Sequence, residues 1–182
     1  MSNEQLTKLT DRNVRILYLS PMNIAVYRSK GDASQGAGLP GIQAINEFTK
    51  NNSFLLRYPE TRRFGLYPNK QDENGDWGFE LWITVQNDTD IPEPFVKSKF
   101  NGGLYAAHTI PVGFYSEWTL LKEWVKDKGH YIFDDKCRVV PEITNQEWVL
   151  EEILNYRGES PDNYITPMQV DLLLPIKENL LG

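Results

Sequence analysis

The sequence predicts an α+β fold of two consecutive β-β-α-β-β units, whose eight strands form one mainly antiparallel sheet with two main helices and a central groove. Two observations predict it. Short apolar or alternating segments, typical of strands, recur in the same order in both halves of the chain. Each half also carries one amphipathic helix pattern between its strands. A unit of about 90 residues is too thin to be stable alone, so we expect the units to share one sheet.

The first unit is expected to span about residues 13–90. It begins with two strand patterns, Val14–Leu19 and Ile24–Arg28, which are close enough in sequence to suggest a hairpin. A helix is predicted to begin near Pro40, because proline suits the first turn of a helix. Apolar residues then follow at near-helical spacing: Ile42, Ile45 and Phe48. The strict alternation in Phe79–Val85 predicts the clearest strand of the chain.

The second unit, about residues 91–178, repeats this plan. Val96–Phe100 and Leu104–Thr109 flank two glycines and predict another pair of strands. A helix is expected to begin at Ser116, and its apolar stripe consists of Phe114, Trp118, Leu121 and Val125. Val170–Ile176 predicts the final strand. The two units together indicate a single domain over residues 13–182.

Charge and hydropathy exclude several classes of protein. The 182 residues carry a net charge of −6, and the longest cationic cluster is Arg62 and Arg63, so direct binding of DNA is not expected. An acidic balance is typical of a soluble protein, or of a site for cationic ligands. Residues 1–12 are polar, without the apolar core of a secretory signal, and are expected to be flexible. With no membrane-spanning stretch in the sequence, we expect a cytoplasmic protein.

The sequence contains few residues that commonly bind metals or act as nucleophiles. One cysteine excludes an internal disulfide, and His108 and His130, the two histidines, lack metal-ligand spacing. We therefore predict no metal and no cofactor, and His108 is expected to be a buried hydrogen-bonding residue. Aromatic residues are abundant, with five Trp, nine Tyr and eight Phe; such residues supply core volume and also line ligand pockets.

Three segments of the second unit carry a resemblance to a known family. Residues 99–129 contain a Gly-Gly-x-Tyr-Ala strand, a glycine-containing loop and an amphipathic helix with tryptophan. Residues 149–156 read VLEEILNY, and residues 169–177 read QVDLLLPIK. In this order the segments resemble the GyrI-like family, the effector-binding domains of bacterial transcription activators. By the order of its elements the resemblance covers residues 13–178.

The resemblance implies two halves related by a pseudo-twofold axis, with ligands bound in the groove between them. Family members often follow a DNA-binding helix-turn-helix domain and sense drugs. Only residues 1–12 precede the domain in this sequence, which is too few for such a module. We therefore expect a stand-alone small-molecule-binding protein that binds or sequesters flat apolar compounds, cationic ones included.

The resemblance also implies an acidic residue in the pocket. The family commonly places a glutamate two positions before a tyrosine on the strand near residues 148–156, where this chain has Leu154. Glu152 is one step along the same strand face and is our choice for the pocket acid; the alternative is a solvated carboxylate. Glu80 and Trp82 share one face of their strand and would add a second acid and an aromatic wall, unless that face is simply exposed. The candidate ligand-binding residues are Glu152, Glu80, Trp82, Tyr105, Tyr156 and Leu154.

Two other functions stay open. Some GyrI-like proteins hydrolyse cyclopropanoid genotoxins, and here Glu152 or Glu80 would be the acid or base of such a reaction. The family is named for an inhibitor of DNA gyrase, so a protein partner such as gyrase or a regulator is the third possibility. The sequence does not predict the oligomeric state.

Overall fold

The computed structural model describes residues 6–31, 39–51, 54–66, 77–136, 139–140, 149–154 and 169–180. The strands are β1 (Val14–Leu19), β2 (Met22–Gly31), β3 (Arg63–Leu66), β4 (Trp77–Val85), β5 (Val96–Phe100), β6 (Gly103–Pro111), β7 (Tyr131–Phe133), β8 (Val139–Val140), β9 (Leu150–Ile153) and β10 (Gln169–Glu178). The helices are α1 (Leu39–Asn51), α2 (Phe54–Arg57) and α3 (Glu117–Lys128). The predicted α+β class is confirmed.

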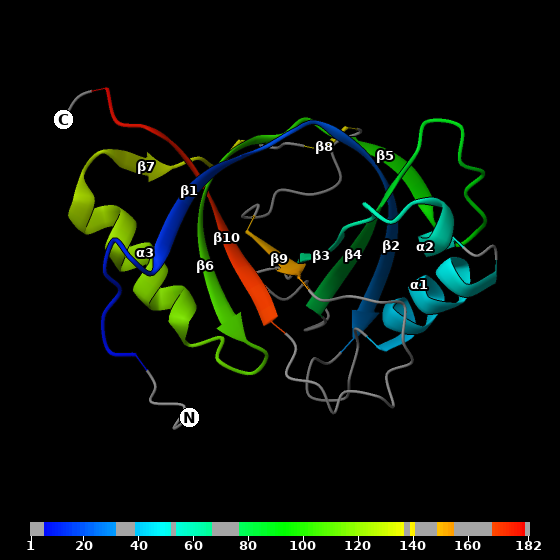
Figure 1. The fold of residues 1–182 in the computed structure, drawn as a ribbon, viewed down its shortest axis with the longest axis horizontal. Helices are drawn as coiled ribbons and strands as arrows, with labels where there is room; N and C mark the ends of the chain where they lie inside the picture. The colour runs from blue at the N-terminus through cyan, green and yellow to red at the C-terminus, as the bar shows by residue number, and fades with distance from the viewer. Residues whose placement is uncertain are drawn as a thin grey trace.

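The strands form one curled antiparallel sheet in the order β1-β6-β10-β9-β3-β4-β2-β5-β8, and β7 pairs with the end of β10 (Figure 1). Strands β1, β2, β3 and β4 of the first unit correspond to β5, β6, β9 and β10 of the second. Exchanging each strand for its counterpart reverses the order from β1 to β5, as a twofold axis requires. The axis of this pseudo-symmetry passes between β9 and β3, where Glu151 is opposite Gly65. The duplicated eight-stranded sheet with two main helices is therefore confirmed, with α2, β7 and β8 as additions.

The hairpin that the sequence suggested for Val14–Leu19 and Ile24–Arg28 was wrong. β1 pairs with β6, and β2 pairs with β4 and β5, so β1 and β2 do not fold back on each other. Instead they form one continuous arc from one half of the molecule to the other (Figure 1). The arc runs beside β5 and β6, with Leu19 opposite Gly103 and Met22 opposite Phe100. At this crossing Gly102 has a φ of +76°, and a Cβ there would lie 2.4 Å from the carbonyl oxygen of Leu19. The connector between β1 and β2 and the connector between β5 and β6, which contains Gly102, thus pass too closely for a side chain at position 102.

Two helices cover one face of the sheet, which we call the helix face. α3 packs on β6 and β10 through Leu121 and Val125, and α1 packs on β2 and β4 through Ile45 and Phe48. Figure 1 shows them on opposite flanks of the molecule. Because β9 and β3 are the central strands of the order, their helix face lies between the two helices.

The other side of the sheet, which we call the helix-free face, carries a core cluster with side chains from both units. Its buried members are Leu19, Ile24, Val26, Phe64, Leu66, Trp82, Phe100, Tyr105, Ala107, Val139, Leu150 and Leu173. No helical residue of the described chain belongs to this cluster. It therefore holds the two units together across the pseudo-twofold axis.

The helix predicted to begin at Ser116 is confirmed as α3. Leu121 and Val125 are buried, as its apolar stripe predicts, and the helix ends at Gly129, whose φ of +69° is favourable for glycine alone. A helix that crosses a membrane needs about 20 apolar residues. None of the helices in the described ranges has that length and hydropathy.

Candidate functional site

Strand β9 presents two consecutive carboxyl groups to opposite faces of the sheet. Leu150 lies in the cluster on the helix-free face, and Glu152 shares that face by alternation, whereas Ile153 packs with the cluster under α3 and shares its face with Glu151. Each of the two glutamates is 8% exposed. The chain therefore buries one acid on each side of β9.

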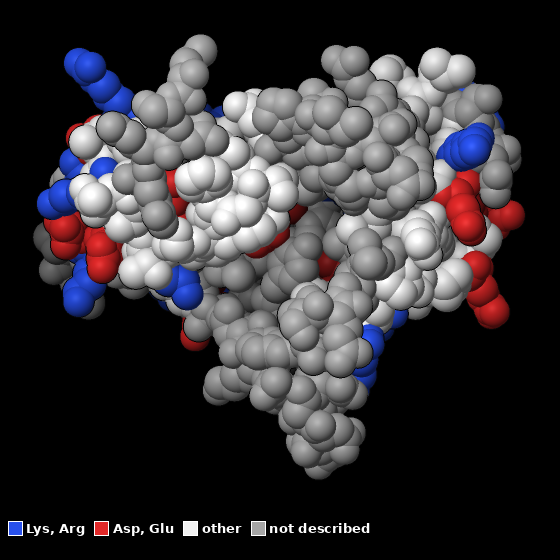
Figure 2. All heavy atoms as spheres, turned by 90° about the horizontal axis from the view of Figure 1, so that it is seen from below, with Lys and Arg blue, Asp and Glu red and all other residues white. Residues whose placement is uncertain are grey.

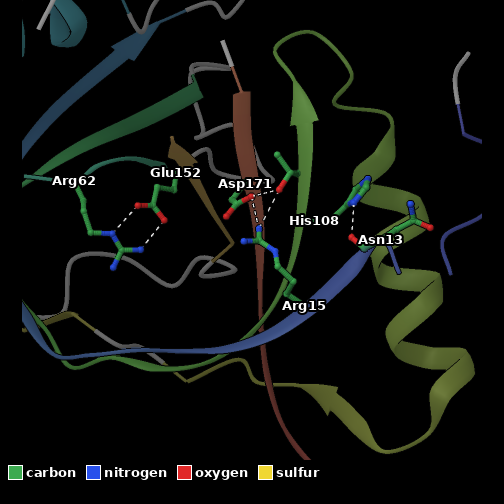
Figure 3. Close-up of polar contacts among 7 residues, drawn as sticks. Asn13, Arg15, Arg62, His108, Glu152 and Asp171 are labelled. Carbon is green, nitrogen blue, oxygen red and sulfur yellow. Dashed lines mark hydrogen bonds and ion pairs between the residues drawn. The ribbon is translucent and has the colours of Figure 1, made fainter. Parts of the chain in front are cut away.

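Glu152 is held by a bidentate ion pair (Figure 3). Nε and Nη2 of Arg62 donate to its two carboxylate oxygens, each at 2.6 Å. The guanidinium group also lies over the ring of Phe64, 5.0 Å from the centroid. Parallel hydrogen bonds of this kind fix geometry and balance the charge of the acid. The residue predicted to be the pocket acid is thus buried but already has a cationic partner.

Glu80, the second predicted acid, is in the same situation on β4. The indole nitrogen of Trp82 donates to one of its oxygens at 3.1 Å, and Nε of Arg28 donates to the other at 3.0 Å. Trp82 and Glu80 therefore share one strand face, as the alternation predicts. The contact with Trp82 is buried, whereas the arginine side chain is 42% exposed.

A third carboxylate on this face repeats the pattern. Asp171 lies opposite Glu152 in the pairing of β10 with β9. It accepts a hydrogen bond from Nη2 of Arg15 at 2.6 Å and another from the hydroxyl group of Thr109 at 2.6 Å (Figure 3). Each of these three acids, Glu152, Glu80 and Asp171, is thus matched by one arginine. A cationic ligand would have to compete with an arginine at each of them.

The predicted aromatic residues Trp82 and Tyr105 are brought together by the fold, but they are enclosed, with exposures of 1% and 0%. Phe100 connects them, with its ring centroid 5.9 Å from that of Trp82 and 6.4 Å from that of Tyr105, and Phe64 extends the series beyond Trp82 at 6.3 Å. These rings form a continuous aromatic core across both units. They contribute packing energy rather than an open wall.

Two predicted residues lie near or beyond the end of β9. Leu154 follows the strand and is 43% exposed. Tyr156 lies outside the described residues. His108, by contrast, is a buried hydrogen-bonding residue as expected, at 4% exposure on β6. The predicted acids that the structure describes therefore lie on the inner strands of the sheet, Glu152 on β9 and Glu80 on β4.

Glu151, which the sequence pattern did not single out, has the most perturbed carboxyl group in the described part of the chain. Burial raises its pKa to about 7, and the hydrogen bond from the indole nitrogen of Trp118, at 3.3 Å, partly offsets this rise. Gly65 pairs with it across the axis and adds no side chain to that face. A carboxyl group that titrates near neutral pH, placed between two helices, is a candidate for binding a cation or moving a proton.

One property of the sequence distinguishes this strand. Glu151 and Glu152 are consecutive in an apolar segment, so alternation places one carboxyl group on each face of the sheet. When both faces are covered, both acids are buried and each needs a partner.

Seen from below, the molecule is hollowed between its two lobes, and acidic side chains are visible there (Figure 2). Within the described ranges no group of three His, Cys, Asp or Glu residues is placed to hold a metal ion.

Comparisons with known proteins agree with this architecture. A family model described as "Cass2: Integron-associated effector binding protein" matches residues 15–176. The C-terminal domain of EcmrR is 14% identical, with a TM-score of 0.61 over 91% of this chain and 98% of that one. SAV2435 bound to tetraphenylphosphonium is 10% identical, with a TM-score of 0.53 over 90% and 93%. A hydrolase from Listeria innocua is 15% identical, with a TM-score of 0.52 over 91% and 92%. No match was found among curated proteins.

Proposed function

This chain belongs to the Cass2 family of integron-associated effector-binding proteins, and on that premise we propose that it binds an apolar aromatic cation between α1 and α3, over the carboxyl group of Glu151. The family match confirms the resemblance to GyrI-like effector-binding domains. The chain is accordingly a small-molecule effector-binding domain.

The observation that carries the proposal is the surroundings of Glu151: its carboxyl group is buried on the helix face beside the indole nitrogen of Trp118, and this burial raises its pKa to about 7. Burial and the hydrogen bond from Trp118 account for this pKa within the described chain, and no arginine or lysine contributes to it. An ionised carboxyl group in such surroundings lacks a cationic partner, and its ionisation is therefore unfavourable. A bound cation would supply the partner that Arg62 supplies to Glu152 on the other face.

The indole ring of Trp118 supports the aromatic part of the proposal. It is half-buried, belongs to α3 and lies directly beside Glu151. Aromatic faces attract organic cations and stack on flat rings, with an attraction of about 0.5–2 kcal/mol per contact. A relative with the same fold, SAV2435, was solved bound to tetraphenylphosphonium, an aromatic cation. The two observations together favour this class of ligand.

The residues predicted from the sequence define a second position, on the helix-free face. Glu80, Trp82, Glu152 and Tyr105 would form its acids and walls. We place it second because Arg28 and Arg62 already neutralise its two glutamates and because Trp82 and Tyr105 are enclosed in the core. A protein partner such as gyrase or a regulator stays a prediction from the sequence.

A hydrolase of cyclopropanoid compounds is the second candidate function, because a carboxyl group with a pKa of about 7 suits proton transfer at neutral pH. In this reaction the carboxylate of Glu151 would accept a proton from water as the water oxygen bonds to a ring carbon. The ring C–C bond breaks, its electron pair passes to the carbonyl group conjugated with the ring, and the carbonyl oxygen takes the proton from Glu151. A relative with this fold is described as a hydrolase. The test is product formation from a cyclopropane-bearing alkylating agent by the wild type and by Glu151→Gln, and equal rates would remove Glu151 from the mechanism.

Calorimetric titration with tetraphenylphosphonium tests the binding proposal. Glu151→Gln keeps the shape of the side chain but cannot ionise, and we expect it to weaken binding by about tenfold or more. Glu152→Gln is the matched control, since it makes the same change one residue away on the other face, and it should bind like the wild type. The reverse result would move the site to the helix-free face. A wild type that binds no aromatic cation would overturn the ligand class.

A further inference from the structure

His108 is fixed by two hydrogen-bond partners on the helix face of β6. Its Nδ1 lies 3.0 Å from the backbone carbonyl oxygen of Asn13, and its Nε2 lies 2.6 Å from Oε2 of Glu117. A carbonyl oxygen can only accept, so Nδ1 carries a hydrogen. The short distance on the other side also requires a proton between the ring and the carboxyl group. With both nitrogens engaged, the ring has a single orientation.

This contact reaches the first turn of α3. Glu117 is the first residue of the helix and is 5% exposed, and the preceding Ser116 makes no side-chain capping hydrogen bond. The first backbone N–H groups of the helix, those of Glu117, Trp118 and Thr119, donate instead to backbone carbonyl oxygens three residues earlier, so the backbone is satisfied without a side-chain cap. Here the pair of His108 and Glu117 ties the start of α3 to the sheet.

The next residue of the helix is Trp118, which reaches a different strand. Consecutive residues of an α-helix project about 100° apart around its axis. Glu117 therefore contacts β6 through His108, while Trp118 contacts β9 through Glu151, with β10 between these two strands. The first turn of α3 is therefore attached to the sheet on both sides, to β6 through Glu117 and to β9 through Trp118.

We propose that His108 is a positioning residue of the ligand site: through Glu117 it fixes the first turn of α3 and so holds the indole ring of Trp118 against Glu151. The expected effect on ligand affinity rests on the function proposed above. The contact between Trp118 and Glu151 exists without ligand and can be measured in its absence. The two hypotheses can therefore fail separately.

The test combines NMR spectroscopy and titration on the full chain. His108→Phe removes both hydrogen bonds of His108, and we expect it to shift the indole NH signal of Trp118. We also expect it to raise the pKa of Glu151 further, because the hydrogen bond from Trp118 to Glu151, which lowers that pKa, is lost. Affinity for tetraphenylphosphonium should fall by about fivefold or more. His108→Gln, whose amide can donate to Glu117, should largely restore the indole NH signal, the pKa of Glu151 and the affinity. The exposed His130 is the matched control, and His130→Gln should change neither.

Each outcome decides a hypothesis. A folded His108→Phe variant with an unchanged indole signal and an unchanged Glu151 pKa would overturn the positioning role. If that variant does not fold, Glu117→Ala removes the same contact from the helix side and must produce the same changes. If the indole signal and the pKa shift but the wild type binds no tetraphenylphosphonium, the positioning role holds and the proposed ligand class is wrong.

Discussion

The carboxyl groups of Glu151 and Glu152 lie on opposite faces of β9, although the two residues are consecutive and equally exposed, at 8% each. Glu152 accepts two hydrogen bonds from Arg62, whereas Glu151 accepts one from Trp118, and burial raises its pKa to about 7. Two glutamate side chains that are neighbours in sequence thus have different chemical properties. One is an ion pair that links β9 to the segment before β3, and the other is a carboxyl group that changes charge near neutral pH.

Replacing Glu151 with glutamine should change how stability depends on pH. In the unfolded chain the carboxyl group ionises with its ordinary pKa of 4.5, and in the folded chain with a pKa of about 7. The folded state therefore holds the proton more tightly, so this group costs nothing below pH 4.5 and destabilises the fold increasingly up to about pH 7. The full cost is about 3 kcal/mol above that pH. Urea unfolding at pH 4.5 and pH 8 should show that Glu151→Gln gains stability relative to the wild type as the pH rises, and a constant difference would contradict the raised pKa.

Removing Arg62 should destabilise the protein more than removing a surface arginine. Arg62→Ala leaves the buried carboxyl group of Glu152 without its two donors. The arginine is 36% exposed, so solvent screens part of the interaction, and we expect a loss of about 1–2 kcal/mol. Arg57 is exposed on α2 and is the matched control; Arg57→Ala should cost less than about 0.5 kcal/mol in the same urea titration. Equal losses would mean that the bidentate pair adds no stability.

The crossing of the two connectors should depend on a glycine. Gly102→Ala would place a methyl group 2.4 Å from the carbonyl oxygen of Leu19, at a φ of +76°, and we expect it to destabilise the fold by about 3 kcal/mol or more. Gly129 has a similar φ of +69° with no atom within 4 Å of the added Cβ. Gly129→Ala therefore measures the backbone strain alone, about 1 kcal/mol. Thermal unfolding of both variants separates the steric effect from the strain, and similar losses would contradict the close crossing.

Much of the fold could be predicted because its elements depend on local pattern. The alternation in β4 and the apolar stripe of α3 are properties of short segments, and both elements are where the pattern places them. The pairing of β1 with β6 depends instead on residues far apart in sequence. A short connector between two strands is consistent with a hairpin or with a strand that continues into the other half, and local sequence does not distinguish the two. The hairpin prediction failed for this reason.

The candidate site was only partly predictable for a related reason. Alternation correctly separates Glu151 from Glu152 on the two faces of β9. It does not say which face receives an arginine, because Arg62 lies 90 residues earlier in the chain and meets Glu152 only in the folded sheet. The same holds for Trp118, whose side chain belongs to the apolar stripe of α3 but whose indole nitrogen reaches Glu151. The partners of a buried acid thus depend on tertiary contacts.

Binding of an aromatic cation should itself depend on pH through Glu151. If the cation binds only the ionised carboxyl group, affinity rises with pH through the pKa of about 7 and levels off once the group is fully ionised. Affinity for tetraphenylphosphonium at pH 8.5 should then exceed that at pH 5.5 by about 30-fold. By linkage, binding at pH 6 must release a proton, which calorimetry in buffers of different ionisation enthalpy detects. Glu151→Gln should bind weakly and without this pH dependence, whereas Glu152→Gln should keep it, because its substitution leaves the helix face unchanged. If Glu151→Gln retains the wild-type pH profile, another group binds the cation, and the site over β9 is wrong.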